Sequence, residues 1–462
     1  MIAENRTYDE LVLGESAEIH RTCTADDLIV FANASGNRNP FHLQRNAGAP
    51  PTVPGMFMGS VISALLGTRL PGPGVRLRAT DLRFPARAHA GDEIVARVTV
   101  IEKRIVAGVA MVKLSAKVLG TDGSVLAEGT VDAEAPTTKI QFNPEEILPT
   151  LVVNSHPFFD ALLAQAAPLD PLVTAVVCPE DANSLSGALM AADETIITPI
   201  LIGRRSKIIA TAEQIGRNID AYELIHCPDG PSAARRAVEL VHEGRAGAVM
   251  KGHLHTDDLL KPMLDKATGL RIGRRFTHIF VMDVPGMNHP LLVTDAAINI
   301  APDLATKVDI CQNAIDLAIS IGIELPKVGV LSAVETVNPQ IPSSLDAALL
   351  SKMAERGQIT GGIVDGPLAM DNAVNLAAAR TKGLTSLVAG HADILVVPNL
   401  DAGNMLAKQL TYLSHAETAG VVMGARVPVI LNSRSDSDIS RLASCAVAAL
   451  HHARMAAQIP SE

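Results

Sequence analysis

The chain has 462 residues, of which 48% are hydrophobic, and its formal net charge is −10. This length is too great for one ordinary hydrophobic core, so we expect two or three domains. No apolar run approaches the roughly eighteen residues that span a bilayer, which argues against a membrane protein. The acidic balance and the absence of Trp argue against nucleic acid as a partner.

The N-terminal residues and the cysteines indicate the compartment. The first residues lack the basic and apolar regions of a signal peptide. The five cysteines are scattered and form no C-x-x-C pair, which is typical of buried thiols in a reducing compartment and not of a disulfide framework or a zinc site. We therefore expect a cytoplasmic protein.

Residues 10–135 show one long apolar helix beside several segments with strand patterns. Thr24 is placed to cap a helix over residues 25–34. Pro54-Gly55 opens an apolar helix over residues 56–70. Strands are predicted over residues 75–84, 93–104, 110–119 and 125–133. The pattern indicates a sheet wrapped around a buried helix.

Several short motifs are spread over this part: Ser35-Gly36, Asn39-Pro40, His42, Gly55-Met56, Leu65-Leu66-Gly67, Leu70-Pro71-Gly72 and Leu82-Arg83-Phe84. Together they resemble a hot-dog domain of the MaoC-like enoyl-CoA hydratase family, which implies an acyl-CoA domain over residues 1–135. In that family an Asp and a His, five positions apart, hold a water for addition to an enoyl thioester. The resemblance implies this role for His42 and puts Asn37 in the place of the Asp. N–H groups near Gly55 would hold the thioester oxygen.

Asn37 leaves the activity of this domain open. A neutral amide orients a water but does not accept its proton. Asn37 and Asn39 also suit ordinary turns, and His42 would then be an ordinary loop residue. A hydratase and a domain that only binds a thioester are both compatible with the sequence.

The pattern changes near residue 136. Residues 136–155 have no clear period and contain three prolines, which is typical of a linker. In residues 156–462 helical segments alternate with buried strands, which indicates a doubly wound α/β domain. The predicted strands are residues 173–178, 198–202, 223–227, 247–250, 327–332, 361–364, 394–397 and 427–431. Predicted helices include residues 232–243, 257–267, 304–321, 344–356 and 439–454.

Polar residues follow several of these strands at their carboxyl ends, where open α/β sheets bind ligands. Lys251 ends one strand and is placed to meet a phosphate or the pyrophosphate of coenzyme A. An exposed Lys in a tight turn is an equal alternative. The loops after two later strands contribute Asp365, Asn399, Asp401 and Gly403 to the same rim.

A further polar group lies within residues 283–302, which are expected to form two extended segments around the turn Pro285-Gly286. Asn288, His289 and Asp295 would be costly to bury without partners. They fit a substrate-binding site and a structural hydrogen-bond network equally well.

The turn between the last predicted strand and the last predicted helix is the most polar of the chain. Ser433 offers a hydroxyl, Arg434 a permanent fork of donors, and Asp436 or Asp438 a proton acceptor. Free N–H groups at the start of a helix favour an anion there. The alternative is that Ser437 or Asp438 simply caps the helix.

Four motifs occur in order along this part, over residues 283–302, 364–373, 398–405 and 424–438. Together they resemble the phosphate acetyltransferase/phosphate butyryltransferase family over about residues 155–455. The resemblance implies an α/β fold of two subdomains, like that of isocitrate and isopropylmalate dehydrogenases. It also implies reversible transfer of an acetyl or butyryl group between coenzyme A and inorganic phosphate. Acyl-CoA, phosphate and acyl phosphate are then the expected partners, and a homo-oligomer is the expected assembly.

The resemblance gives specific roles to the polar turn. Arg434 would bind the phosphate group and offset the developing oxyanion, and Ser433 would hydrogen-bond the thiol sulfur or the carbonyl. Asp438, or Asp436 if the turn is offset, would handle the thiol proton. In the family the neighbouring loops line the cleft in which both substrates are bound at once. This chemistry needs no metal ion and no redox cofactor.

Two other functions are compatible with the same residues. A metal-dependent decarboxylating dehydrogenase would use Asp365, Asp371, Asp401 and Asp436 as ligands, although the chain contains no G-x-G-x-x-G fingerprint. An acyl-CoA-binding regulatory protein would bind the same ligands without turnover. An acyltransferase forms a thioester from acyl phosphate and coenzyme A, whereas neither the dehydrogenase nor the regulatory protein would do so.

Overall fold

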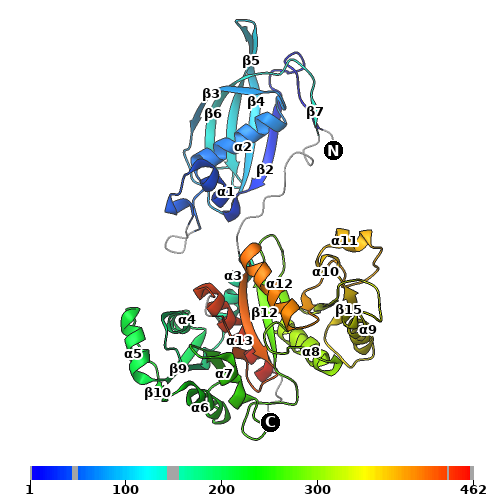
Figure 1. Ribbon diagram of the computed structural model, residues 1–462. Helices are drawn as coiled ribbons and strands as arrows, with labels where there is room; N and C mark the ends of the chain where they lie inside the picture. The colour runs from blue at the N-terminus through cyan, green and yellow to red at the C-terminus, as the bar shows by residue number, and fades with distance from the viewer. Residues whose placement is uncertain (1–2, 44–49, 143–155, 434–435, 458–462) are drawn as a thin grey trace. The chain divides into compact units, whose positions relative to one another are not determined.

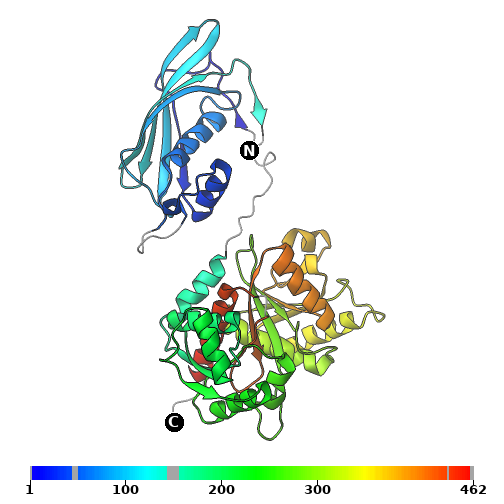
Figure 2. The same cartoon turned by 60° about the vertical axis from the view of Figure 1, so that its left-hand side comes forward.

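The computed structural model describes residues 3–43, 50–142, 156–433 and 436–457. The chain divides into two compact units, Met1–Ser155 and His156–Glu462. Figures 1 and 2 show each of them from two directions.

In the first unit an antiparallel sheet curves around one helix (Figure 1). The strand order is β2-β4-β5-β6-β3, and the helix is α2 (Gly55–Thr68). The strands are β2 (Ser16–Thr22), β3 (Arg76–Arg83), β4 (Glu93–Val106), β5 (Val109–Gly120) and β6 (Val125–Glu134). The sheet wrapped around a buried helix is confirmed.

Apolar side chains of α2 and the sheet form the core of this unit. Ile62 and Leu65 of α2 are at most 1% exposed. Along β4, buried residues alternate with more exposed ones, because successive side chains of a strand point to opposite faces. At Gly129 in β6 a Cβ atom would lie 1.8 Å from the carbonyl oxygen of Asp81 in β3. The absent side chain therefore lets β6 and the edge strand β3 approach each other.

A short helix and a polar loop lead to α2. Helix α1 (Ala25–Ser35) begins with a complete capping box, in which the side chains of Thr24 and Asp27 each accept from the other's backbone N–H. It ends at Gly36, whose φ of 73° suits glycine. The loop continues into the 3-10 helix η1 (Pro40–His42). The loop before α2 therefore starts from a fixed helix end.

The first part of the expected linker belongs to the first unit. Strand β7 (Gln141–Phe142) pairs with β1 (Ala3–Glu4). Asn5 is fully buried and its side chain bonds Ile140 N at 3.0 Å and Thr138 O at 2.8 Å. This segment is held by a side-chain amide and a two-residue ladder, which leave no periodic pattern in the sequence. Residues 143–155, the rest of the expected linker, lie outside the described residues.

The second unit contains one mixed sheet of order β10-β9-β8-β11-β18-β17-β12-β13-β16-β14-β15. Strands β10 to β18 in this order are parallel neighbours, which we call the first half. The second half runs from β17 to β15. At the junction β17 is antiparallel to both β18 and β12, and β12 is antiparallel to β13. The sheet is therefore mostly parallel, and its antiparallel pairs lie at the junction of the two halves.

Helices cover the sheet of the second unit, and Figure 1 shows α13 near its centre. The strands are β8 (Leu172–Val177), β9 (Ile197–Gly203), β10 (Leu224–His226), β11 (Ala248–Lys251), β12 (Thr277–Asp283), β13 (Leu291–Thr294), β14 (Lys327–Leu331), β15 (Ile363–Leu368), β16 (Ile394–Val396), β17 (Glu417–Met423) and β18 (Val429–Ile430). The helices are α3 (Pro157–Ala166), α4 (Ala182–Asp193), α5 (Arg205–Gln214), α6 (Gly230–His242), α7 (Thr256–Met263), α8 (Leu304–Ser320), α9 (Pro342–Glu355), α10 (Met370–Val374), α11 (Leu376–Thr381), α12 (Leu400–Leu413) and α13 (Asp438–Ala457).

The topology brings the ends of β11 and β18 together at a place suited to a ligand. The chain leaves β8 toward β9 and later returns to β11 on the other side of β8. Such a reversal opens a crevice at the carboxyl ends of the parallel strands. Lys251 ends β11, and Ser433 follows β18 by three residues. Two of the predicted site residues are therefore carried by neighbouring strands.

Candidate active site

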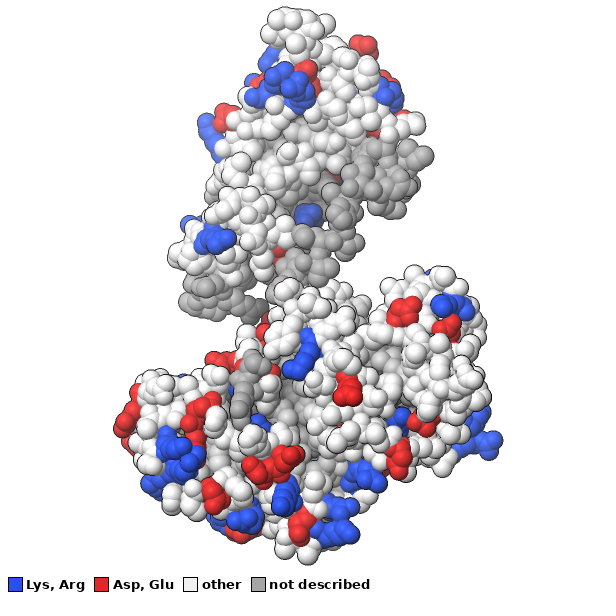
Figure 3. Space-filling view, viewed as in Figure 1, with Lys and Arg blue, Asp and Glu red and all other residues white. Residues whose placement is uncertain are grey.

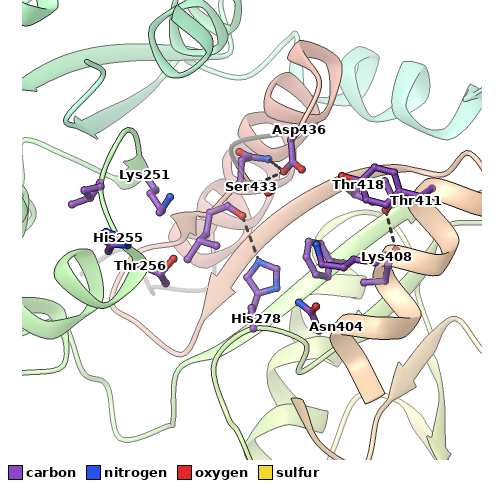
Figure 4. Close-up of a pocket in the computed structure, with 17 residues that line it drawn as sticks. Lys251, His255, Thr256, His278, Asn404, Lys408, Thr411, Thr418, Ser433 and Asp436 are labelled. Carbon is purple, nitrogen blue, oxygen red and sulfur yellow. Dashed lines mark hydrogen bonds between the residues drawn. The ribbon is translucent and has the colours of Figure 1, made fainter. Parts of the chain in front are cut away.

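A cavity of about 380 Å³ lies between the two halves of the second unit (Figure 4). Its walls come from β11, the start of α7, β12, α12, β17 and the loop after β18. In Figure 4, Lys251 and Thr256 lie on one side, Asn404 and Lys408 on the other, and His278 between them. The lining residues are Lys251, Leu254, His255, Thr256, His278, Phe280, Ala297, Asn404, Ala407, Lys408, Thr411, Tyr412, Thr418, Leu431, Asn432, Ser433 and Asp436.

Lys251 is at the wall of this cavity and is only 7% exposed. The chain turns sharply after it, and a Cβ atom at Gly252 would lie 2.4 Å from the carbonyl oxygen of Cys178. Glycine is therefore needed for the close approach of this turn to β8. Lys251 therefore places a buried positive charge at the cavity wall, and it is not the exposed Lys of the alternative interpretation.

The loop after β18 places Ser433 and Asp436 together. The backbone N–H of Ser433 donates to Asp436 Oδ2 at 2.7 Å, and Asn432 Nδ2 donates to the same oxygen at 3.3 Å. Burial raises the pKa of Asp436 above its ordinary value, although these donors and the nearby Arg441 and His278 act in the opposite direction. Asp436 is therefore a cavity-lining carboxyl whose pKa is raised, a feature that is common at functional sites.

Asp438 and Arg434 are the two other predicted catalytic residues of this turn. Asp438 is the first residue of α13, is exposed and does not line the cavity. The turn instead positions the other candidate, Asp436, against the Ser433 N–H. Arg434 lies outside the described residues. Its predicted role remains a prediction.

Buried polar residues of α13 hold the loop that carries Ser433. Arg441 is 3% exposed and its Nη2 donates to the carbonyl oxygen of Ser433 at 3.0 Å. Ser437 Oγ accepts from the N–H of Ser440 at 3.0 Å and so caps the first turn of α13. The hydroxyls of Ser437 and Ser440 also donate to Glu417 in β17, at 2.8 and 2.6 Å respectively. The expected capping role of Ser437 coexists with the site at Ser433.

His278 in β12 was not predicted from the sequence, although it is fully buried and lines the cavity. Burial lowers the pKa of the His278 imidazole and favours the neutral ring. Its edge packs on the Phe280 ring, with centroids 4.4 Å apart. The only sequence signal is a histidine within an apolar strand, and such a residue is more often part of a core.

Helix α12 supplies the opposite wall through Asn404, Lys408 and Tyr412. Their spacing of four residues places them on one face of a helix, which is the signal that could have identified them. The predicted substrate-binding residues Asn399 and Gly403 have structural roles in α12 instead. Asn399 caps α12 by accepting from Ala402 N at 3.0 Å. At Gly403 a Cβ atom would lie 2.9 Å from a backbone oxygen, so glycine lets α12 approach its neighbour.

Like Asn399 and Gly403, five further predicted substrate-binding residues do not line the cavity. Asp401 is exposed in the first turn of α12. Asn288 and His289 lie in the turn between β12 and β13, at the opposite end of that hairpin from His278. Asp365 lies on the edge strand β15 and accepts from the Ser386 hydroxyl. The fold places these residues at other parts of the sheet. Their order along the sequence does not show this, because it does not tell which strands become neighbours.

The fifth, Asp295, has the structural role that was left open. It is 2% exposed and accepts the backbone N–H groups of Ala297, Ile298 and Asn299 at 3.0–3.1 Å. Asn299 Nδ2 donates to it as well, at 2.5 Å. The carboxylate therefore fixes a turn whose Ala297 lines the cavity.

The first unit has its own cavity, of about 520 Å³, lined by His42, Gly55, Met58 and Phe84 among others. His42 Nδ1 lies 2.7 Å from the Thr52 carbonyl oxygen. A carbonyl only accepts, so Nδ1 carries the hydrogen and Nε2 keeps the lone pair of the neutral ring. Asn37 is exposed, accepts from Asn39 N at 3.4 Å and does not line the cavity.

Among the described residues, no group of three or more His, Cys, Asp or Glu residues could hold a metal ion. No helix of the described chain is long and apolar enough to cross a bilayer. On the face in Figure 3, acidic and basic side chains are interspersed and form no basic stripe among the described residues.

Comparison with known proteins identifies the family of the second unit. Residues 231–449 match the model described as phosphate acetyl/butaryl transferase. Phosphate acetyltransferase of Rhizobium meliloti is 56% identical over 302 residues, which cover 65% of this chain and 96% of that protein. The chain belongs to the phosphate acetyl/butyryltransferase family. Phosphate butyryltransferase of Clostridium acetobutylicum is 41% identical over 292 residues, covering 63% of this chain and 97% of that protein.

A solved structure and a second family model complete the comparison. A branched-chain phosphotransacylase from Enterococcus faecalis is similar with a TM-score of 0.54 and 33% identity, covering 61% of this chain and 99% of that one. Residues 13–120 match the MaoC-like domain model. The chain therefore joins a MaoC-like hot-dog domain to an acyltransferase of the phosphate acetyl/butyryltransferase family, as the sequence motifs indicated.

Proposed function

We propose that the second unit transfers a short acyl group reversibly between coenzyme A and inorganic phosphate. The observation that carries this proposal is a cavity with the buried cation Lys251 on one wall and the carboxyl of Asp436, whose pKa is raised, beside Ser433. A phosphate needs a positive charge such as that of Lys251. A thiol that gains or loses a proton needs a carboxylate such as that of Asp436. The activities named for the relatives from Rhizobium meliloti and Clostridium acetobutylicum support the same reaction.

In the acyl phosphate-forming direction, a phosphate oxygen attacks the thioester carbonyl, the C–S bond breaks and coenzyme A leaves as a thiolate. Lys251 attracts the phosphate, and Arg434 adds its fork of donors to the phosphate and the oxyanion. Ser433 hydrogen-bonds the sulfur or the carbonyl oxygen. In the reverse direction, Asp436 accepts the thiol proton before the sulfur attacks.

Three further properties belong to this proposal. The subdomains are arranged as in isocitrate and isopropylmalate dehydrogenases, and one sheet running through both halves supports this arrangement. The reaction uses no metal ion or redox cofactor. The protein forms a homo-oligomer.

The test follows thioester absorbance after acyl phosphate and coenzyme A are mixed with the purified chain. Arg434→Ala should lower kcat about a hundredfold or more, the usual scale for one oxyanion donor, and Arg434→Lys should restore only part of it. Activity should survive exhaustive EDTA treatment. A near-normal rate in folded Arg434→Ala protein, or a loss on chelation that Mg²⁺ or Mn²⁺ restores, would count against this mechanism.

For the first unit we propose binding of an enoyl thioester in the cavity at His42, with slow addition of water. The observation that favours it is the bond from His42 to the Thr52 carbonyl, which leaves Nε2 as a base. Thioester oxygen would meet the N–H groups at the start of α2 near Gly55. Crotonyl-CoA is the substrate for the assay, and its hydration is read as loss of the conjugated double bond.

A further inference from the structure

Two polar atoms of the acyltransferase cavity have no hydrogen-bond partner among the described residues: His278 Nδ1 and Asn432 Oδ1. Both residues line the cavity, and they are 0% and 4% exposed. A buried polar atom without a partner costs free energy, so such atoms are rare in folded proteins. Their position beside Ser433 and Asp436 points to a bound substrate as the missing partner.

Both atoms are acceptors. His278 Nε2 lies 3.5 Å from the Leu431 carbonyl oxygen, which only accepts, so Nε2 carries the hydrogen of the neutral ring and Nδ1 the lone pair. Asn432 Nδ2 donates to Asp436 Oδ2 and, at 2.9 Å, to Ser444 Oγ. Ser444 uses its own hydrogen on Ser440 O. The amide nitrogen of Asn432 is thus fixed, and Oδ1 is the atom that lacks a donor.

The missing partner must therefore donate a hydrogen, and the substrates of the proposed reaction differ in this respect. Inorganic phosphate keeps an O–H group near neutral pH, but its net negative charge would be repelled by lone pairs next to the Asp436 carboxyl. The thiol of coenzyme A is only a weak donor. The amides of its pantetheine arm belong to the part of the molecule beyond the thiol, whereas His278 and Asn432 are buried. A neutral hydroxyl on the acyl group fits best.

We propose that this cavity is built for a short 3-hydroxyacyl group, whose hydroxyl donates to His278 Nδ1 or Asn432 Oδ1. The inference rests on the proposed acyltransferase function and names its substrate class. Asn432 adjoins Ser433 and bonds Asp436, so this acceptor belongs to the same turn as the residues proposed to act on the thioester. Phe280, Ala407 and Leu431 give the rest of the cavity an apolar lining for a short chain.

The position of the hydroxyl links this substrate to the first unit. Water addition to an enoyl thioester places the hydroxyl on C3 and the hydrogen on C2, without oxidation or reduction. The product of the reaction proposed for the first unit is thus a 3-hydroxyacyl thioester. The second unit would then exchange its coenzyme A for phosphate, and the two reactions would follow one another.

The test compares butyryl-CoA with both enantiomers of 3-hydroxybutyryl-CoA in phosphate-dependent loss of thioester by the full chain. One enantiomer should have a kcat/KM about tenfold or more above that of butyryl-CoA, the scale of a satisfied buried hydrogen bond. His278→Phe keeps a ring but removes the acceptor, and Asn432→Leu removes the other. At least one of them should reduce this ratio to near one. Asp401→Asn, in the first turn of α12 and outside the cavity, should leave the ratio unchanged.

The outcomes separate the two proposals. If neither thioester reacts, the acyltransferase function itself fails. Equal rates for the three thioesters in the natural protein would overturn only the hydroxyacyl inference. The same holds if both acceptor variants lower all rates together at a constant ratio, because the acceptors would then serve coenzyme A. Where a variant is too unstable to assay, the rise in Tm that 3-hydroxybutyryl-CoA gives beyond butyryl-CoA in the natural protein decides: a larger rise supports the inference, and an equal rise overturns it.

Discussion

Asp436 and Asp438 are two residues apart but have different surroundings. Burial raises the pKa of Asp436 above its ordinary value of 3.8, whereas Asp438 is exposed at the start of α13. As the acceptor of the thiol proton, Asp436 must be ionised. The rate of thioester formation from acyl phosphate should therefore fall as the pH drops through the raised pKa. Asp436→Asn should remove this acid limb and lower kcat about a hundredfold or more.

The matched control is Asp438→Asn, which removes one carboxylate from the same turn and should leave the pH profile nearly unchanged. The pH–rate profiles of both variants are measured in protein of equal Tm. If Asp438→Asn abolishes the acid limb and Asp436→Asn keeps it, the proton acceptor has been assigned to the wrong residue.

Asn37 carries the second prediction at the scale of one residue. Its neutral amide is exposed and lies outside the cavity of His42. Asn37→Asp is nearly isosteric and adds a carboxylate that the approaching thioester and water can use. Acid–base groups contribute roughly a hundred to ten thousandfold, so hydration of crotonyl-CoA should rise by a measurable part of that range. Rapid hydration by the natural protein, or no gain in a folded variant that binds the thioester, would contradict this expectation.

At the scale of elements, the contact between α4 and α13 supports the catalytic loop. A Cβ atom at Gly187 in α4 would lie 2.4 Å from Cδ of Arg441, whose guanidinium holds the Ser433 carbonyl. Alanine favours a helix over glycine by about 1 kcal/mol, but overpacking costs about 1–3 kcal/mol. Gly187→Ala should therefore lower Tm by a few degrees and reduce kcat. Ser186→Ala, one residue earlier on the same helix, should do neither. A higher Tm with unchanged kcat in Gly187→Ala would show that Arg441 does not position the loop.

At the scale of the whole molecule, each unit contains its own core and its own cavity. Limited proteolysis should cut first within residues 143–155, where Pro144 and Pro149 interrupt any regular pattern. The fragment over residues 150–462 should keep acyltransferase activity. It retains α3, where the Phe159 N–H donates to the buried Asp283 at 2.9 Å. The measurement is kcat of the fragment against that of the full chain. Loss of activity in a folded fragment would mean that the first unit contributes to the site.

The sequence determined those features that depend on neighbours along the chain. The strands predicted over residues 173–178 and 427–431 correspond to β8 and β18, because buried parallel strands are short apolar runs. The capped start of α1 and the apolar α2 follow from local patterns in the same way. The four motifs over residues 283–302, 364–373, 398–405 and 424–438 identified the family because their order along the chain is itself part of the signal.

Only the tertiary structure decided which distant residues share the cavity. His278 and Lys408 lie 130 positions apart, and the antiparallel junction of β12 with β17 and the packing of α12 bring them to one site. The same topology carries Asn288, His289 and Asp365 away from it, although their sequence motifs are equally polar. Burial, which is a property of the folded chain, distinguishes Asp436 from Asp438 and leaves two acceptors in the cavity without donors. A sequence orders residues along a line, whereas the pKa of a group and its hydrogen-bond partners depend on what surrounds it in space.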